Sequence, residues 1–166
     1  RLVGGTPEER RVAVRAAGSA LTPVTVRLLG PKVVAGRIPA SEWRPGTLDE
    51  YAECLRAVCA VLRDAACGSD SETGAQARSV IIENLRHLLW WGLAEDVRRA
   101  LDTPSLSDRE RCLALERIDE FVAFDCREDR PANQKPHVNA VKADANKLRA
   151  ALTPSGDHGR IVELVG

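Results

Sequence analysis

The segment RSVIIENLRHLLWWGLAEDVRRAL, residues 78–101, decides the fold. Its apolar residues Ile81, Leu85, Leu88 and Leu89 recur at i, i+4, i+7 and i+8, a pattern that places side chains on one face of an α-helix. Gly92 interrupts this pattern, and a second stripe with the same spacing starts at Leu93. The segment therefore predicts two helices joined by a tight corner at Trp91-Gly92. The first of these helices is apolar around most of its surface, so neighbouring hairpins must cover it.

The tryptophans at this corner, Trp90 and Trp91, have two interpretations. Aromatic side chains at a helix junction usually supply buried area, and we expect both to belong to the core. If they were exposed, the same rings would form a stacking surface for a base or a sugar. We therefore include both among the candidate interaction residues.

Length and composition indicate one helical domain over residues 1–166. Its 44% hydrophobic and 29% charged residues are typical of a soluble globular protein. No apolar run approaches the roughly 18 residues that a membrane span requires, so we expect no membrane partner. The sequence contains no methionine, which predicts that it was excised from a longer chain.

Charge and cysteine usage limit the functions further. Lys and Arg together number 24 and so do Asp and Glu, so no net charge attracts nucleic acid. The five cysteines form no CxxC pair, and no signal peptide opens the chain. We expect reduced thiols in a cytoplasmic protein, with no metal and no cofactor.

The first half of the chain carries clear helix starts and stops. Capping boxes at residues 6–9 (TPEE) and 47–50 (TLDE) each predict a helix start, and residues 69–72 (SDSE) supply another. The first helix is expected to end near Leu21, where Thr22-Pro23 follows, leaving a shorter apolar piece at residues 24–29. Residues 31–46 are expected to form an irregular loop that Trp43 fixes to the helical body.

The second half shows the same kind of pattern. A capping box at residues 107–110 (SDRE) predicts a helix whose inward residues are Cys112, Leu115, Ile118, Phe121 and Val122. Residues 125–136 are expected to be a loop. The next helix is marked by its apolar residues Val138, Val141, Ala145, Leu148 and Leu152, and a last short helix by Ile161, Val162 and Leu164.

No segment alternates with a period of two over enough residues to predict a strand. The fold class predicted is all-α: six to eight helices in antiparallel hairpins, forming a solenoid-like array rather than a closed four-helix bundle. An Ala/Leu/Arg-rich helical bundle would show a similar composition and is the alternative architecture.

Several helix ends resemble one another, as in VRAA (residues 14–17), VRRA (97–100) and LRAA (148–151), and three of the ends lead to Thr-Pro. Together with the charged, alanine-rich start PEERRVAVRAA (7–17), these echoes resemble HEAT and armadillo α-solenoids. The resemblance implies a scaffold or sensor region, of the kind often fused to a signalling or defence NTPase in bacteria.

The sequence offers no catalytic motif: it has no phosphate-binding glycine loop, no HExxH and no GxSxG. Four arginines flank a helix corner and complete the candidate interaction surface: Arg98, Arg99, Arg109 and Arg111. We expect a non-catalytic interaction or scaffold module that binds a protein partner or a neighbouring domain of its own chain. The alternative is a helical ligand-sensing or nucleic-acid-contacting domain that uses Trp90-Trp91 or these arginines.

Overall fold

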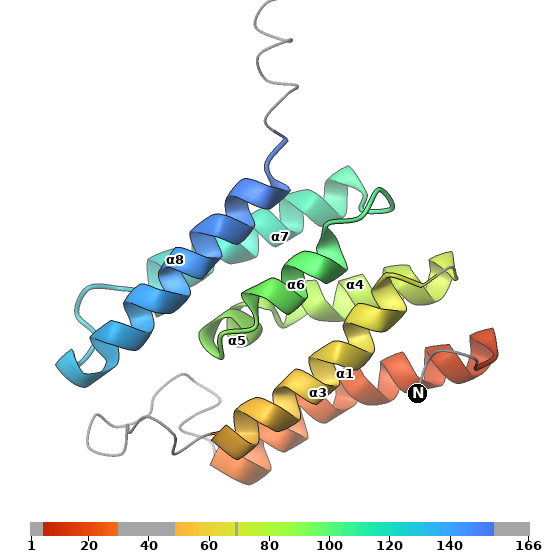
Figure 1. Cartoon of the computed structure of the whole chain (residues 1–166), viewed down its shortest axis with the longest axis horizontal. Coiled ribbons are helices and arrows are strands. Elements are labelled where there is room, and N and C mark those ends of the chain that lie inside the picture. The colour runs from red at the N-terminus through yellow and green to blue at the C-terminus, as the bar shows by residue number, and fades with distance from the viewer. Residues whose placement is uncertain (1–4, 30–48, 69, 155–166) are drawn as a thin grey trace, which may run out of the picture.

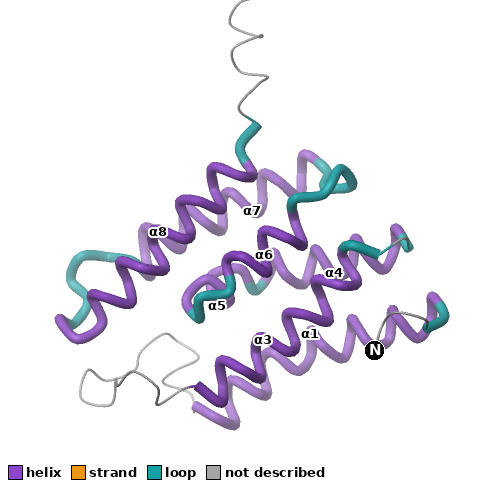
Figure 2. The backbone as a smooth tube through the Cα atoms, in the orientation of Figure 1, coloured by secondary structure: helices purple, strands orange, loops and turns teal. Residues whose placement is uncertain are grey.

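The computed structural model describes residues 5–29, 49–68 and 70–154, and every regular element in these ranges is helical (Figure 2). The prediction of an all-α fold is confirmed. The elements in chain order are α1 (Pro7–Leu29), α3 (Asp49–Ala66), α4 (Ser71–Glu83), α5 (Leu85–Trp90), α6 (Ala94–Leu101), α7 (Asp108–Glu120), the π-helical turn η1 (Phe121–Asp125), the 3-10 turn η2 (Ala132–Gln134) and α8 (Lys135–Leu152).

The helices form three groups along the molecule (Figure 1). Helices α1 and α3 pack together at one end, and α7 packs with α8 at the other. Helices α4, α5 and α6 lie between these pairs and contact both of them (Figure 1). The segment that decides the fold therefore occupies the centre of the molecule.

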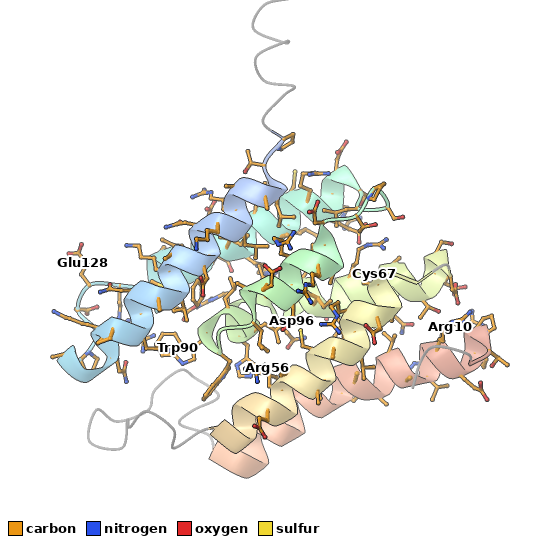
Figure 3. The ribbon with its side chains drawn as sticks, viewed as in Figure 1. Arg10, Arg56, Cys67, Trp90, Asp96 and Glu128 are labelled. Atoms are coloured by element: carbon orange, nitrogen blue, oxygen red, sulfur yellow. The ribbon has the colours of Figure 1, made fainter. Side chains whose placement is uncertain are left out.

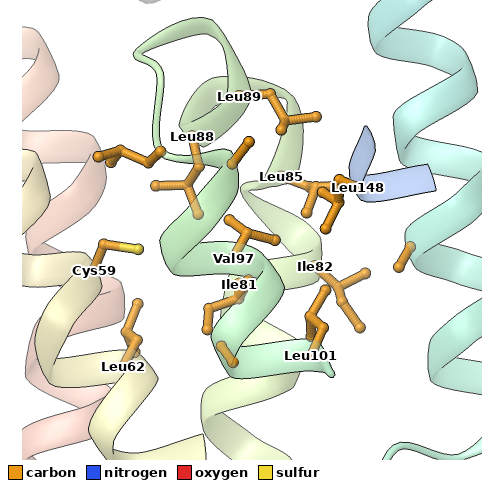
Figure 4. Close-up of a cluster of buried hydrophobic side chains, with 14 of the residues drawn as sticks. Cys59, Leu62, Ile81, Ile82, Leu85, Leu88, Leu89, Val97, Leu101 and Leu148 are labelled. Atoms are coloured by element: carbon orange, nitrogen blue, oxygen red, sulfur yellow. The ribbon is translucent and has the colours of Figure 1, made fainter. Parts of the chain in front are cut away.

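The hydrophobic core is built around this central group (Figure 4). Ile81 of α4 and Leu85 and Leu88 of α5 are completely buried. The core includes Leu62 from one flanking pair and Leu148 from the other. Each such leucine contributes about 1.5–3 kcal/mol when it leaves water, so the central helices hold both pairs in place.

Local hydrogen bonds confirm three of the predicted helix starts. Thr6 N–H donates to Glu9 Oε2 at 2.8 Å, and Glu9 N–H donates to Thr6 Oγ1 at 3.2 Å. The same reciprocal arrangement joins Ser107 to Glu110, and Asp70 caps α4 through the amides of residues 72 and 73. The start predicted at residues 47–50 lies partly outside the described residues.

The helix end predicted near Leu21 is wrong, because α1 continues through Pro23 to Leu29. Proline inside a helix costs about 3 kcal/mol, since it lacks an N–H donor and crowds the preceding turn. Helix α1 packs along α3 and also contacts α4. Packing of this kind offsets a local penalty that the sequence pattern alone treats as a stop.

The central segment also contains a break that its periodicity does not predict. Helix α4 ends at Glu83 and α5 begins at Leu85, because the chain turns at Asn84. The Asn84 side chain donates to the carbonyl oxygen of Val80 at 2.9 Å. The N–H of Asn84 donates to the same carbonyl at 3.2 Å, so the side chain and the backbone share this acceptor at the break.

The inward face of α7 agrees with the predicted one in part. Ile118 and Phe121, both predicted to be inward, are completely buried, but Cys112 is exposed and the unpredicted Ala114 is buried in its place. Leu115 and Val122 are only partly buried. The helix has neighbours on two sides, α4 and α8, so their positions decide which stripe is inward.

The C-terminal helix follows its prediction more closely. All five of its predicted apolar residues are buried: Val138, Val141, Ala145, Leu148 and Leu152. The loop predicted for residues 125–136 is shorter, because it contains η2 and α8 already begins at Lys135. The predictions for Trp43, for the loop at residues 31–46 and for a helix near Ile161 lie outside the described residues. In the part of the chain that is described, no helix is both long and apolar enough to cross a membrane.

Candidate functional site

The tryptophan corner lies in the core. Trp90 is 7% exposed and Trp91 is 9% exposed, as expected of aromatic residues at a helix junction. The Arg130 guanidinium lies 4.9 Å from the centre of the Trp90 ring, and the His137 ring meets Trp90 edge-to-face at 5.0 Å. Figure 3 shows Trp90 beside α8. The corner therefore joins α5 to α8 and does not offer an open stacking surface.

Two histidines are packed at this corner. His137 Nε2 lies 2.7 Å from the carbonyl oxygen of Trp90, and the His87 ring stands edge-to-face with Trp91 at 6.4 Å. Burial lowers the pKa of His87. Burial also lowers the pKa of His137, and the hydrogen bond with Trp90 opposes this effect only in part. Both imidazoles are therefore neutral near pH 7.

Arg98 and Arg99 of the predicted surface lie on α6 among acidic residues. Arg98 pairs with Glu95 at 2.6 Å and with Asp102 at 3.4 Å, and Arg99 pairs with Glu95 at 3.5 Å. Hydrogen bonds from Arg98 hold the pKa of Glu95 below its ordinary value. These two positive charges are therefore compensated along their own helix.

The other two predicted arginines lie at the start of α7 and have different roles. Arg111 Nη1 donates to the carbonyl oxygen of Leu152 at 3.1 Å, which satisfies one acceptor at the end of α8. Arg109 is exposed and forms no ion pair within the described residues. The four arginines thus have separate surroundings and do not act as one basic cluster.

A groove of about 480 Å³ lies on the surface where α4 packs against α7. We call it the α4–α7 groove. Its apolar lining comes from Ala75, Ile82 and Leu113. Leu113 is 37% exposed, more than any other leucine whose side chain the structure describes. The polar and charged groups around it include Ser79, Glu83, Arg109 and Arg117. The groove is thus an apolar depression with a charged rim, the usual form of a peptide-binding surface.

A buried ion pair connects the two walls of the groove. Arg78 of α4 is 5% exposed, and its Nε donates to Glu110 Oε2 of α7 at 2.8 Å. Burial acts to raise the pKa of Glu110, but hydrogen bonds from Arg78 and Ser107 outweigh it and hold the pKa below its ordinary value. A Cβ on Gly74 would lie 3.3 Å from Arg78 Nη1, so a glycine at this position leaves room for the guanidinium.

Ion pairs at the groove and beyond its Glu83 end show the relative direction of the helices that form its walls. Arg78 pairs with Glu110, and farther along the chain Arg86 pairs with Glu120 and Asp125. The run from α4 into α5 therefore advances in the same direction as α7. Phe124 lies under the Arg86 guanidinium at 5.7 Å and is 59% exposed, beyond the Glu83 end of the groove.

A second, smaller cleft of about 200 Å³ lies between α6 and α8. Gly92 and Ala94 line one side of it, and Asp144 and Lys147 line the other. Its charges are of both signs, and its Arg98 is already paired with Glu95. Among the described residues, no group of three or more His, Cys, Asp and Glu side chains could hold a metal ion.

Of the groove residues, the sequence singled out only Arg109 as a candidate. Leu113 is not among the residues predicted to face inward on α7. This was the one indication in the sequence that its apolar side chain is exposed. The sequence did not indicate that Arg78 belongs to the site, because its partner Glu110 lies 32 residues farther along the chain.

No protein family, curated protein or solved structure matches the chain in comparisons with known proteins. The resemblance to HEAT and armadillo proteins therefore rests on the sequence pattern.

Proposed function

We propose that this chain is a non-catalytic interaction module that binds an apolar peptide segment in the α4–α7 groove. The observation that carries the proposal is Leu113, a large apolar side chain left 37% exposed inside a groove with charged walls. Covering such a surface is favourable by about 25 cal/mol for each Å² of apolar area removed from water.

The groove has dimensions that suit a helical segment. Its lining residues run from Ala75 to Glu83 on α4 and from Arg109 to Arg117 on α7. At a rise of about 1.5 Å per residue, each wall is roughly 12 Å long, or about two helical turns. An amphipathic peptide that presents an apolar residue to the groove would cover Leu113, whereas Ile82 is only 5% exposed and already belongs to the core.

The wider setting is part of the same proposal. The module works as a solenoid-like scaffold of antiparallel hairpins within a larger cytosolic protein, where it binds a protein partner or another domain of its own chain. The succession of α1 with α3, then α4 to α6, then α7 with α8 supports a stack that grows in one direction (Figure 1). The four described cysteines are free, which is compatible with a reducing compartment.

The experiment is a selection of helical peptides displayed against the full chain, followed by measurement of their affinity. Leu113→Asp places a charge in the groove and is expected to weaken the selected peptides at least tenfold. Val12→Asp is the matched control, because Val12 is an apolar residue 52% exposed on α1. Peptides that bind both variants equally well, or a selection that enriches none, would contradict the proposal.

The alternative function, ligand sensing or nucleic-acid contact, has less support. The rings of Trp90 and Trp91 are buried, and acidic side chains pair with Arg98 and Arg99. Phosphate binding requires basic groups whose charge is not already compensated. Arg109 meets that condition, but it lies at the rim of an apolar groove.

A further inference from the structure

We infer that the partner of the α4–α7 groove is an amphipathic helix with two apolar anchor residues about three turns apart, one packed on Leu113 and one on Phe124. On the same face this helix carries an acidic side chain for Arg109 and a basic side chain for Glu83. The inference rests on the function proposed above: it names the class of partner and extends the site. Two exposed apolar side chains and two uncompensated charges carry it.

The two apolar side chains lie on the same side of one helical run. Leu113 of α7 is 37% exposed, and Phe124 of η1 is 59% exposed. Leu113 lines the groove beside α4, and Phe124 lies under Arg86 of α5, the helix that follows α4. The two positions are 11 residues apart, or about three turns, which is roughly 16 Å along the run. The surface that a partner covers therefore extends beyond the groove to Phe124.

A π-helical turn sets the position of Phe124. The N–H of Cys126 donates to the carbonyl oxygen of Phe121, five residues earlier, at 3.1 Å. Phe121 is completely buried, whereas Phe124 lies outside the core with the Arg86 guanidinium 5.7 Å from its ring centre. Isolated π-helical turns occur frequently at functional sites. An exposed aromatic ring held by a cation suits an anchor position, because aromatic residues dominate the energetics of interfaces.

The charges that line the groove are compensated except at two positions. Glu110 and Arg117 form ion pairs with neighbours on the protein itself. Arg109 and Glu83 are exposed and form no ion pair within the described residues. A partner that brings one negative and one positive side chain compensates both. Exposed pairs of this kind add little affinity, but they determine which partner binds and in which register.

These groups have a fixed order along the surface. Arg109 precedes Leu113 by one turn of α7. Glu83 lies about one turn before Arg86, whose partner is Glu120, so Glu83 is level with α7 beyond Leu113. A partner therefore meets a cation, an apolar side chain, an anion and then an aromatic ring. Positions spaced about i, i+4, i+8 and i+15, read in either direction, present the matching series on one face of an α-helix.

Small side chains on the α4 wall let a helix approach closely. Ala75 and Ser79 are exposed there, one turn apart, and Glu83 follows one turn farther. An amphipathic helix that lays its apolar face in a groove is a common mode of peptide recognition. Within the described ranges the chain has no strand edge to which an extended peptide could add.

The first experiment measures how the displayed helical peptides, selected on the full chain, depend on the second anchor. Phe124→Ser is expected to weaken them about five-fold or more, because an apolar side chain loses its contact. Val12→Ser is the matched control, since Val12 is an exposed apolar residue on α1. The urea midpoints of both variants are expected to stay close to that of the unaltered chain. Peptides that bind the two variants equally well would overturn the inference.

The second experiment exchanges the charges of the groove. The selection is repeated on the full chain with Arg109→Glu and Glu83→Arg together, which leaves the net charge unchanged. The enriched peptides are expected to carry their acidic and basic residues in exchanged places relative to the two anchors. Arg56→Glu with Glu53→Arg is the control, because both residues are exposed on α3, which does not line the groove (Figure 3). The same charge order from both selections would contradict the inference.

The outcomes separate the two proposals. If binding depends on Leu113 but not on Phe124, or if the charge order does not follow the exchange, the inference is wrong and the proposed function stands. If no displayed peptide binds in a way that depends on Leu113, both are wrong. Dependence on both apolar residues, together with an exchanged charge order, supports the inference.

Discussion

Arg78 and Glu110 form a buried ion pair that joins the two walls of the α4–α7 groove. Arg78 Nε donates to one carboxylate oxygen at 2.8 Å, while the other oxygen accepts the N–H of Ser107 at 3.0 Å. One carboxylate therefore both caps α7 and fixes α7 to α4. The groove keeps its shape because a helix start and an interhelical contact share the same side chain.

Arg78→Met is expected to lower the free energy of unfolding by about 1–3 kcal/mol, because it leaves the Glu110 carboxylate without its charged partner. Glu110 is 21% exposed, and water that reaches it limits the loss. Urea denaturation measures the effect. Arg127→Met is the control, since the pair of Arg127 with Asp129 is exposed and should contribute less than about 1 kcal/mol. Equal effects of the two substitutions would show that the buried pair does not stabilise the fold.

Gly92→Ala is expected to destabilise the chain by about 1–2 kcal/mol, because Gly92 has a φ of +79°, where a Cβ crowds the backbone. Apart from its chain neighbours, no atom of the described residues lies within 4 Å of the Cβ position, so the cost comes from the backbone and not from a clash. Gly92→Asn is the informative comparison, since asparagine tolerates this region better than alanine does. Thermal unfolding should rank glycine above asparagine and asparagine above alanine, and any other order contradicts this explanation.

Stability is expected to fall as the pH decreases from 7.5 to 5.5. Burial lowers the pKa of His87 and of His137 below the ordinary value of 6.5, so the unfolded chain binds protons that the folded chain does not. Their contribution to stability is complete above pH 6.5 and is lost as the pH falls toward the lowered pKa values. Urea midpoints at several pH values measure this loss.

Substituting both histidines with glutamine provides the control for this pH dependence. The carboxylates with lowered pKa values, Asp70, Glu95 and Glu110, lose their contribution only at lower pH, near and below their ordinary values of 3.8 and 4.5. The double variant should therefore show a smaller change in midpoint between pH 7.5 and 5.5. If the double variant shows the same change in urea midpoint between pH 7.5 and 5.5, groups other than His87 and His137 cause the pH dependence.

The cysteines are expected to differ in their reaction with a thiol reagent. Cys67 and Cys112 are exposed, whereas burial raises the pKa of Cys59 to about 12 and that of Cys126 to about 11. The thiolate is the reactive form, so the two buried residues should react slowly until the chain unfolds. Mass spectrometry of modified peptides assigns each site, with the chain in denaturant as the control. Modification of native Cys59 as fast as that of Cys112 would contradict the packing of α3.

Hydrogen bonds between near neighbours were predictable from the sequence. The reciprocal cap of Thr6 with Glu9, the corresponding cap at Ser107 and the N-cap at Asp70 each involve residues no more than three positions apart. The apolar stripe of α8 and the corner at Gly92 also depend only on periodicity and on local backbone freedom. These signals depend on residues close together in the sequence, and the structure keeps them, unlike the predicted stop at Pro23.

The candidate site was only partly predictable. The sequence indicated Trp90 and Trp91 as core residues or as a binding surface. The packing of Trp90 against Arg130 and His137, and of Trp91 against His87, decided for the core. Arg98, Arg99 and Arg111 look alike in the sequence, yet their partners give them separate structural roles. Leu113 became a candidate only when α4 and α7 were seen to leave a groove at its side chain.

The sequence by itself thus determined the helical class, most helix starts and the residues of the central core, because these depend on spacings of three or four positions. Only the tertiary structure decided that α1 continues through Pro23, that Ala114 and not Cys112 is inward, and that Arg78 finds its partner 32 residues away. The physical reason is that packing between distant helices contributes energies comparable to or larger than local propensities. The groove arises in the same way, from how α4 and α7 pack against each other.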